Sequence, residues 1–266
     1  MSEQLIVAGF HRSGTSLVSQ LLHRAGLFLG YDLMGATFSN PYGHYEDNEV
    51  YDLHQQILAD NGLDWLVARP FLPVVIEPRW RQMERFIQRR NADHDLWGFK
   101  DPRVCLFMML WKHLLPNARA LLVYRHFADT THSLSRRQSV EMFSNPEGPA
   151  RMYRRFWEEP DLALRMWLAH NELLLTFART YPEDTLAVSI EMVQRGFPLI
   201  KAVNRRWDLG LDEITVSEVL DPTAIQRRSG RQPISDRALI PRIEATWQAL
   251  EELGEQAQQL SRETTV

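Results

Sequence analysis

The sequence predicts an α/β fold in three layers, with a central parallel sheet of about four to five strands flanked by helices. Short apolar runs of strand length recur at residues 5–8, 95–99, 118–124 and 186–190. Each run is followed by a longer stretch in which the apolar residues have helical spacing. Because ligands gather at the carboxyl ends of parallel strands, we expect a binding site where these runs end.

Composition is typical of a soluble globular protein, with 44% hydrophobic and 24% charged residues in 266. We interpret residues 1–266 as a single domain. The net charge of −4 argues against broad nucleic-acid binding. One cysteine, Cys105, excludes an internal disulfide, and His11, His44 and His54 are not spaced as metal ligands. No stretch resembles a signal peptide or a transmembrane segment, so we expect a cytoplasmic protein without an integral membrane segment.

The segment 5–30 combines a strand, a tight loop and the start of a helix. Residues 5–8 are apolar, residues 9–14 interrupt the run, and helical spacing begins at Thr15 and ends near Gly26. Backbone N–H groups and the positive end of the helix dipole then point to one place. This arrangement predicts a phosphate or a sulfate beside the loop, whose only cation is Arg12.

The loop has the spacing of a nucleotide-binding P-loop, G-x-x-x-x-G-x-S, but Thr15 stands where kinases and ATPases carry a lysine. Without that charge on the β- and γ-phosphates, ordinary ATP hydrolysis is disfavoured. The letters G-F-H-R-S-G-T-S resemble instead the 5'-phosphosulfate loop of sulfotransferases that use 3'-phosphoadenosine-5'-phosphosulfate (PAPS). The resemblance implies a P-loop-like fold and a set of donor-binding residues: Arg12, Ser13, Gly14, Thr15 and Ser16.

A second signature follows the run at 118–124. Arg125 stands at its end, and Ser133 lies eight residues later on the following helix. In the sulfotransferase family an arginine and a serine at this spacing hold the 3'-phosphate of the donor. The resemblance extends to residues 43–47 and 100–103, and loosely to the arginine-rich segment 221–235. In the family a loop like this last segment closes over the 3'-phosphate, which implies a role for Arg228.

Sulfuryl transfer needs a fixed donor, a neutralised leaving phosphate, a deprotonated acceptor and alignment of the three centres. The resemblance assigns the first two tasks to Arg12, the helix start and the backbone N–H groups of residues 13–16. Lys100 is a second candidate cation for the bridging oxygen. The family's reaction takes no metal, and we expect none here.

Three residues are candidates for the general base, and we rank Glu46 first. Its alternative role is to stabilise the start of a helix through the dipole. Asp101 is second, and its alternative role is to anchor a turn or to pair with Arg103. His44 is third, because its ordinary pKa suits proton transfer near neutral pH.

The sequence thus predicts a PAPS-dependent sulfotransferase. We expect in-line transfer of a sulfuryl group to a hydroxyl of a carbohydrate, lipid or small metabolite, with a carboxylate as base and 3'-phosphoadenosine-5'-phosphate (PAP) as product. One alternative is a P-loop kinase or NTPase in which Arg12 replaces the missing lysine. Another is a nucleotide-binding module without catalysis. We expect mobile loops at 31–45, 61–73, 144–160 and 221–235, and a tail that frays after Gly254.

Overall fold

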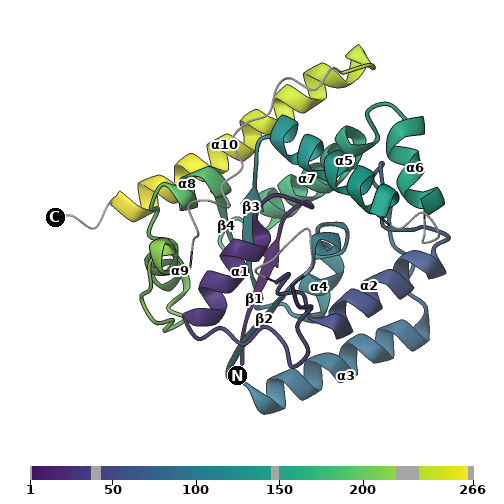
Figure 1. Cartoon of the computed structure of the whole chain (residues 1–266). Helices are drawn as coiled ribbons and strands as arrows, with labels where there is room; N and C mark the ends of the chain where they lie inside the picture. Colours follow the sequence, from purple (N-terminus) through teal and green to yellow (C-terminus); the bar gives the residue numbers. More distant parts are fainter. Residues whose placement is uncertain (1, 37–42, 145–149, 220–233, 263–266) are drawn as a thin grey trace.

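A four-stranded parallel sheet with the order β2-β1-β3-β4 forms the centre of the protein, as a computed structural model shows (Figure 1). The structure describes residues 2–36, 43–144, 150–219 and 234–262. The α/β fold predicted from the sequence is confirmed. The strands are β1 (Glu3–Ala8), β2 (Leu96–Lys100), β3 (Arg119–Tyr124) and β4 (Thr185–Ser189).

Both faces of the sheet are covered by helices, which makes three layers. Leu5 and Val7 point into one core, whereas Ile6 and Ala8 point into the other, as the alternation of a strand requires. Because both faces are buried, the strands read as continuous apolar runs. The helices are α1 (Thr15–Arg24), α2 (Asn48–Asp60), α3 (Glu77–Asp93), α4 (Met108–Leu114), α5 (Phe127–Ser144), α6 (Ala150–Glu158), α7 (Leu162–Thr180), α8 (Ile190–Gln194), α9 (Leu199–Trp207) and α10 (Ile240–Arg262). Within the described residues, short 3-10 turns are formed by η1 (Pro102–Leu106), η2 (Val216–Glu218) and η4 (Arg237–Leu239).

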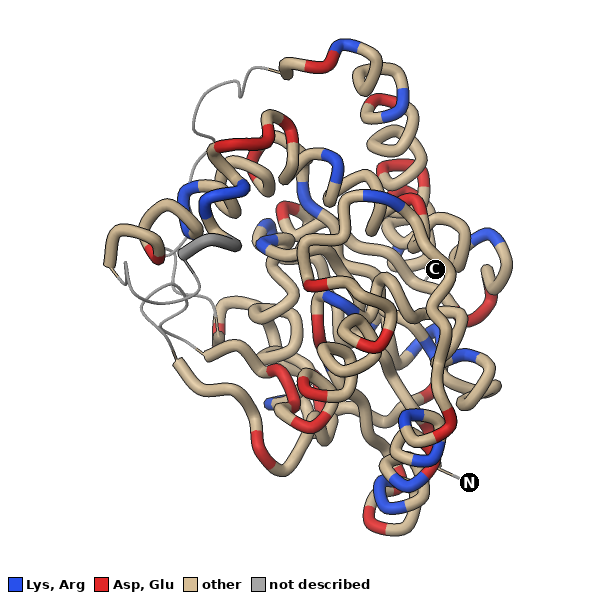
Figure 2. The backbone as a smooth tube through the Cα atoms, turned by 90° about the vertical axis from the view of Figure 1, so that its right-hand side faces the viewer, with Lys and Arg blue, Asp and Glu red and all other residues tan. Residues whose placement is uncertain are grey.

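Charges of both signs are interspersed along the outer helices, as Figure 2 shows. Several form exposed pairs, such as Arg79 with Asp60 at 2.8 Å. In the described ranges, none of the helices combines the length and the apolar character needed to cross a bilayer.

The strand order places the predicted site. β1 lies between β2 and β3, so the loop that follows β1 is flanked by the ends of both neighbours. The pairs Val7↔Lys100 and Ala8↔Leu122 bring these ends to one edge of the sheet. Lys100 closes β2, and Arg125 follows β3 directly. The topology therefore gathers the loop and both cationic strand ends, as expected.

The prediction of a loop at 144–160 is wrong, because most of its described residues are helical. α5 continues to Ser144, and Ala150–Glu158 forms the helix α6. Phe156 of this helix packs against Trp65 at a ring distance of 6.0 Å, and Trp157 packs against Phe143 of α5 at 5.4 Å. Residues 145–149 lie outside the described part of the chain.

The other expected loops have mixed outcomes. Residues 61–73 contain neither helix nor strand, and the described parts of 31–45 are also irregular. Most of the segment 221–235 lies outside the described residues. Whether any of these loops moves stays a prediction.

The prediction that the tail frays after Gly254 is wrong, because α10 continues to Arg262. Gly254 lies against β3: a Cβ there would stand 2.0 Å from the Tyr124 hydroxyl oxygen. Beyond it, Ala257 is buried in one of the two cores. The glycine is therefore a point of close helix–sheet contact inside the helix rather than its end.

Candidate active site

Two glycines allow the loop between β1 and α1 to pack closely against its neighbours. A Cβ on Gly9 would stand 2.3 Å from the Val123 carbonyl oxygen, so the loop begins pressed against β3. Gly14 has φ 90°, a left-handed conformation that favours glycine, and it lies against Ile190. Gly14 also precedes α1 without a side-chain cap. An uncapped helix start at the strand ends is suited to bind an anion.

The residues of this loop differ in backbone conformation and in hydrogen bonding. Arg12 adopts a left-handed φ of 66°, and the amide of Ser13 donates to the Phe10 carbonyl at 3.1 Å. The Ser13 amide is therefore occupied by a hydrogen bond within the loop, although the resemblance assigns Ser13 to donor binding. Thr15 and Ser16 belong to the first turn of α1.

The Arg12 side chain joins the loop to α5. Its Nε donates to Ser133 Oγ at 3.1 Å, a contact between residues 121 positions apart in the chain. Burial, together with the charges of Arg137 and Arg125, lowers the pKa of Arg12 to about 10. Two residues predicted to bind the 3'-phosphate, Arg125 and Ser133, therefore lie near the loop arginine. Arg125 Nε also lies 3.8 Å from Glu191 Oε1.

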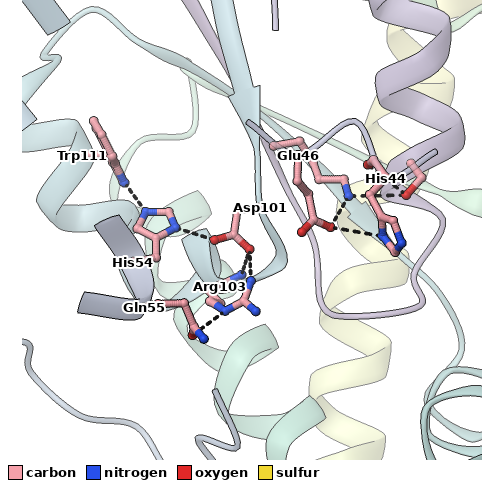
Figure 3. A network of polar contacts seen from close by, with 9 residues as sticks. His44, Glu46, His54, Gln55, Asp101, Arg103 and Trp111 are labelled. Carbon is pink, nitrogen blue, oxygen red and sulfur yellow. Dashed lines mark hydrogen bonds and ion pairs between the residues drawn. The ribbon is translucent and has the colours of Figure 1, made fainter. Parts of the chain in front are cut away.

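A buried polar group stands on the other side of the start of α1 (Figure 3). Lys100 Nζ lies 2.7 Å from Glu46 Oε1 and 3.4 Å from Ser16 Oγ. His44 Nδ1 is 3.8 Å from the same Glu46 oxygen, and Ser16 Oγ donates to the His44 carbonyl at 3.2 Å. The structure thus brings together two predicted catalytic residues, Glu46 and Lys100, and one loop residue.

Glu46 does not serve the start of α2. That position is taken by Asp47, whose side chain accepts a hydrogen bond from the Glu49 amide. Glu46 instead turns its carboxylate to Lys100 at the end of β2. This geometry favours a role in the site over a role in the helix dipole.

Asp101 lies in a separate, fully buried network. Its carboxylate accepts from His54 Nδ1 at 2.7 Å, from Arg103 Nη1 at 2.7 Å and from the Arg103 amide at 3.1 Å. Trp111 Nε1 donates to the other ring nitrogen of His54 at 2.8 Å. Burial would raise the pKa of Asp101, but Arg103 and the His54 hydrogen bond outweigh it and hold the pKa below its usual value.

Asp101 therefore has the role that its alternative reading described. It closes the turn after β2 and pairs with Arg103, and its carboxylate is occupied by three donors. An acceptor proton would have to compete with those donors for a carboxylate of lowered pKa. Among the three candidates for the base, the geometry favours Glu46 over Asp101.

His44 is buried, with 6% of its surface exposed. Burial lowers its pKa to about 4, and the charges of Lys100, Arg137 and Arg12 act in the same direction. Neutral at pH 7, the ring is available to accept a proton but is a weak base.

This lowered pKa predicts acid sensitivity. The unfolded chain protonates His44 at its ordinary pKa of about 6.5, while the folded protein resists protonation until about pH 4, so the free energy of unfolding falls as the pH drops between these values. We expect the free energy of unfolding of His44→Gln to fall by about 1–2 kcal/mol less than that of the wild type when the pH drops from about 7 to about 5. Chemical denaturation at the two pH values measures this. The exposed His113→Gln is the control, and an unchanged pH slope in His44→Gln would contradict the assignment.

Aromatic rings border the loop on the side of α6. The His11 ring lies 5.1 Å from Trp65 and 6.2 Å from His170, both edge to face. Burial lowers the pKa of His11 well below its usual value, and that of His170 to about 4. These neutral rings form an apolar border to the loop.

Arg228, implied by the resemblance, lies outside the described part of the chain. Sequence reasoning also missed Arg137, one helical turn after Ser133 on α5, although its spacing from Ser133 was a usable signal. Within the described ranges, no three His, Cys, Asp or Glu side chains are grouped as metal ligands.

Compared with known protein families and with curated proteins, the chain finds no counterpart: no family model matches it, and no curated protein is similar to it.

Proposed function

We propose that this protein is a PAPS-dependent sulfotransferase. The observation that carries the proposal is the contact of Arg12 with Ser133 at 3.1 Å, with Arg125 close by. It brings the loop after β1 beside the end of β3. A donor with anions at both its 5' and 3' positions fits such a pair of cationic sites, because each arginine can form charge-assisted hydrogen bonds with a phosphate.

The residues divide the work of an in-line displacement. Glu46 accepts the proton of the acceptor hydroxyl while the oxygen of that hydroxyl attacks the sulfur of the donor. Lys100, Arg12 and the start of α1 stabilise the charge that grows on the leaving phosphate as the bridging S–O bond breaks. Lys100 stands between Glu46 and Ser16, so it reaches both the base and the loop. The products are a sulfate ester and PAP.

A P-loop kinase or NTPase is the second candidate, and one observation favours it. Lys100 Nζ lies 3.4 Å from Ser16 Oγ, so a lysine stands beside the loop even though Thr15 does not supply one. Such an enzyme would need Mg²⁺ with its nucleotide. The two functions therefore differ in a property that is simple to measure.

Calorimetric titration distinguishes them. We expect PAP to bind without magnesium at least about tenfold more tightly than ATP with magnesium, because ATP lacks the 3'-phosphate that Arg125 and Ser133 would hold. Tighter binding of ATP, dependent on magnesium, would contradict the sulfotransferase and support the kinase.

A further inference from the structure

Arg137 is a partly buried cation that the proposed reaction does not use. It lies four residues after Ser133 on α5, and residues at this spacing share a helix face. Since Ser133 faces Arg12, Arg137 faces the site as well. Its Nε is buried without a hydrogen-bond partner, and within the described ranges it forms no ion pair.

The two arginines that are fully buried among the described residues are paired. Arg90 contacts Asp47, and Arg103 pairs with Asp101 at 2.7 Å. Buried polar groups are normally given partners in this way, because leaving one without a partner is costly. The buried Nε of Arg137 lies in a position where a ligand can supply such a partner.

The position of Arg137 distinguishes it from the site of the 3'-phosphate. α5 begins at Phe127, two residues after Arg125, and runs away from the end of β3. At 1.5 Å per residue, Arg137 lies about 6 Å farther along the axis than Ser133. Its charge lowers the pKa of both His11 and His44, and acts on Tyr153 of α6. The guanidinium therefore faces the side of the loop where Glu46 and the aromatic rings stand.

We propose that Arg137 binds an anionic group carried by the acceptor, so that the substrates are hydroxyl compounds that also bear a sulfate, phosphate or carboxylate. The inference rests on the proposed function. The donor's two anions already have partners at Arg125 with Ser133 and at the loop with Lys100. A neutral acceptor would leave the buried Nε of Arg137 without a partner, and sites built for a polar group reject analogues that lack it.

The test uses inorganic sulfate as a probe on protein saturated with PAP, at constant ionic strength. We expect sulfate to bind the PAP complex of the wild type, and Arg137→Gln to weaken this binding at least about tenfold. PAP affinity should stay within about twofold of the wild type. Arg137→Lys, which keeps the charge, should retain part of the sulfate binding. The matched control is Arg136→Gln, an exposed arginine on the same helix.

Three outcomes would overturn the inference. The first is that sulfate does not bind the PAP complex of the wild type, and the second is that it binds equally well after Arg137→Gln. The third is that Arg137→Gln loses PAP affinity, which would assign the residue to the donor. If the wild type does not bind PAP at all, the proposed function itself is wrong, and that result is visible before any sulfate is added.

Discussion

Replacing Glu46 by glutamine is expected to lower sulfuryl transfer by about a hundredfold to ten-thousandfold, the usual contribution of a general base. The amide cannot accept the hydroxyl proton, but it fills nearly the same volume. Because the carboxylate faces Lys100 and not the arginines, PAP affinity should stay within about threefold of the wild type. Transfer of labelled sulfate from PAPS to an acceptor and calorimetry with PAP measure the two effects separately.

The ion pair with Lys100 complicates this variant. Lys100 is 1% exposed, and removing one partner of a buried pair costs about 3–5 kcal/mol of stability. Turnover is therefore expressed per PAP-binding site, so that unfolded protein does not count as inactive enzyme. Glu49→Gln is the matched control, because Glu49 lies three residues away on α2 and is partly exposed. Turnover of Glu46→Gln within about threefold of the wild type would contradict the base assignment.

Arg125→Ala is expected to weaken PAP binding by about tenfold to a hundredfold, the loss typical of a charge-assisted hydrogen bond. The guanidinium follows β3 and stands near Arg12 and Ser133, where the 3'-phosphate is proposed to bind. Arg119→Ala is the control on the same strand. Arg119 lies at the opposite end of β3, paired with Asp184 at 2.6 Å. Equal PAP affinity in both variants would remove Arg125 from the donor site.

The sheet was predictable because its strands are buried on both faces. Such strands are continuous apolar runs, and the four runs in the sequence correspond to β1–β4. α6 was missed because it carries several charges, as loops often do, and because its packing contacts, Phe156 with Trp65 and Trp157 with Phe143, are tertiary. The end of α10 was predicted too early because Gly254 was interpreted as a helix end. The glycine is instead required by its tertiary contact with Tyr124, which no local sequence pattern reveals.

The site was predictable where chain topology decides it. Arg12, Lys100 and Arg125 follow neighbouring strands, so parallel order alone brings them to one edge. The fate of Asp101 was not predictable, because its partner His54 lies 47 positions upstream on another element. The same holds for Lys100, which pairs with Glu46 across 54 positions. Contacts of this kind depend on packing rather than on spacing in the sequence.

The central claim is that the loop after β1 and the end of β3 hold the two phosphates of one nucleotide. Binding of PAP and of AMP, which lacks the 3'-phosphate, to the wild type and to Arg125→Ala tests it in a single thermodynamic cycle. If the claim is right, Arg125→Ala weakens PAP by about tenfold or more but leaves AMP almost unchanged. If the substitution weakens both nucleotides equally, or neither of them, Arg125 does not hold the 3'-phosphate, and the proposed donor site is wrong.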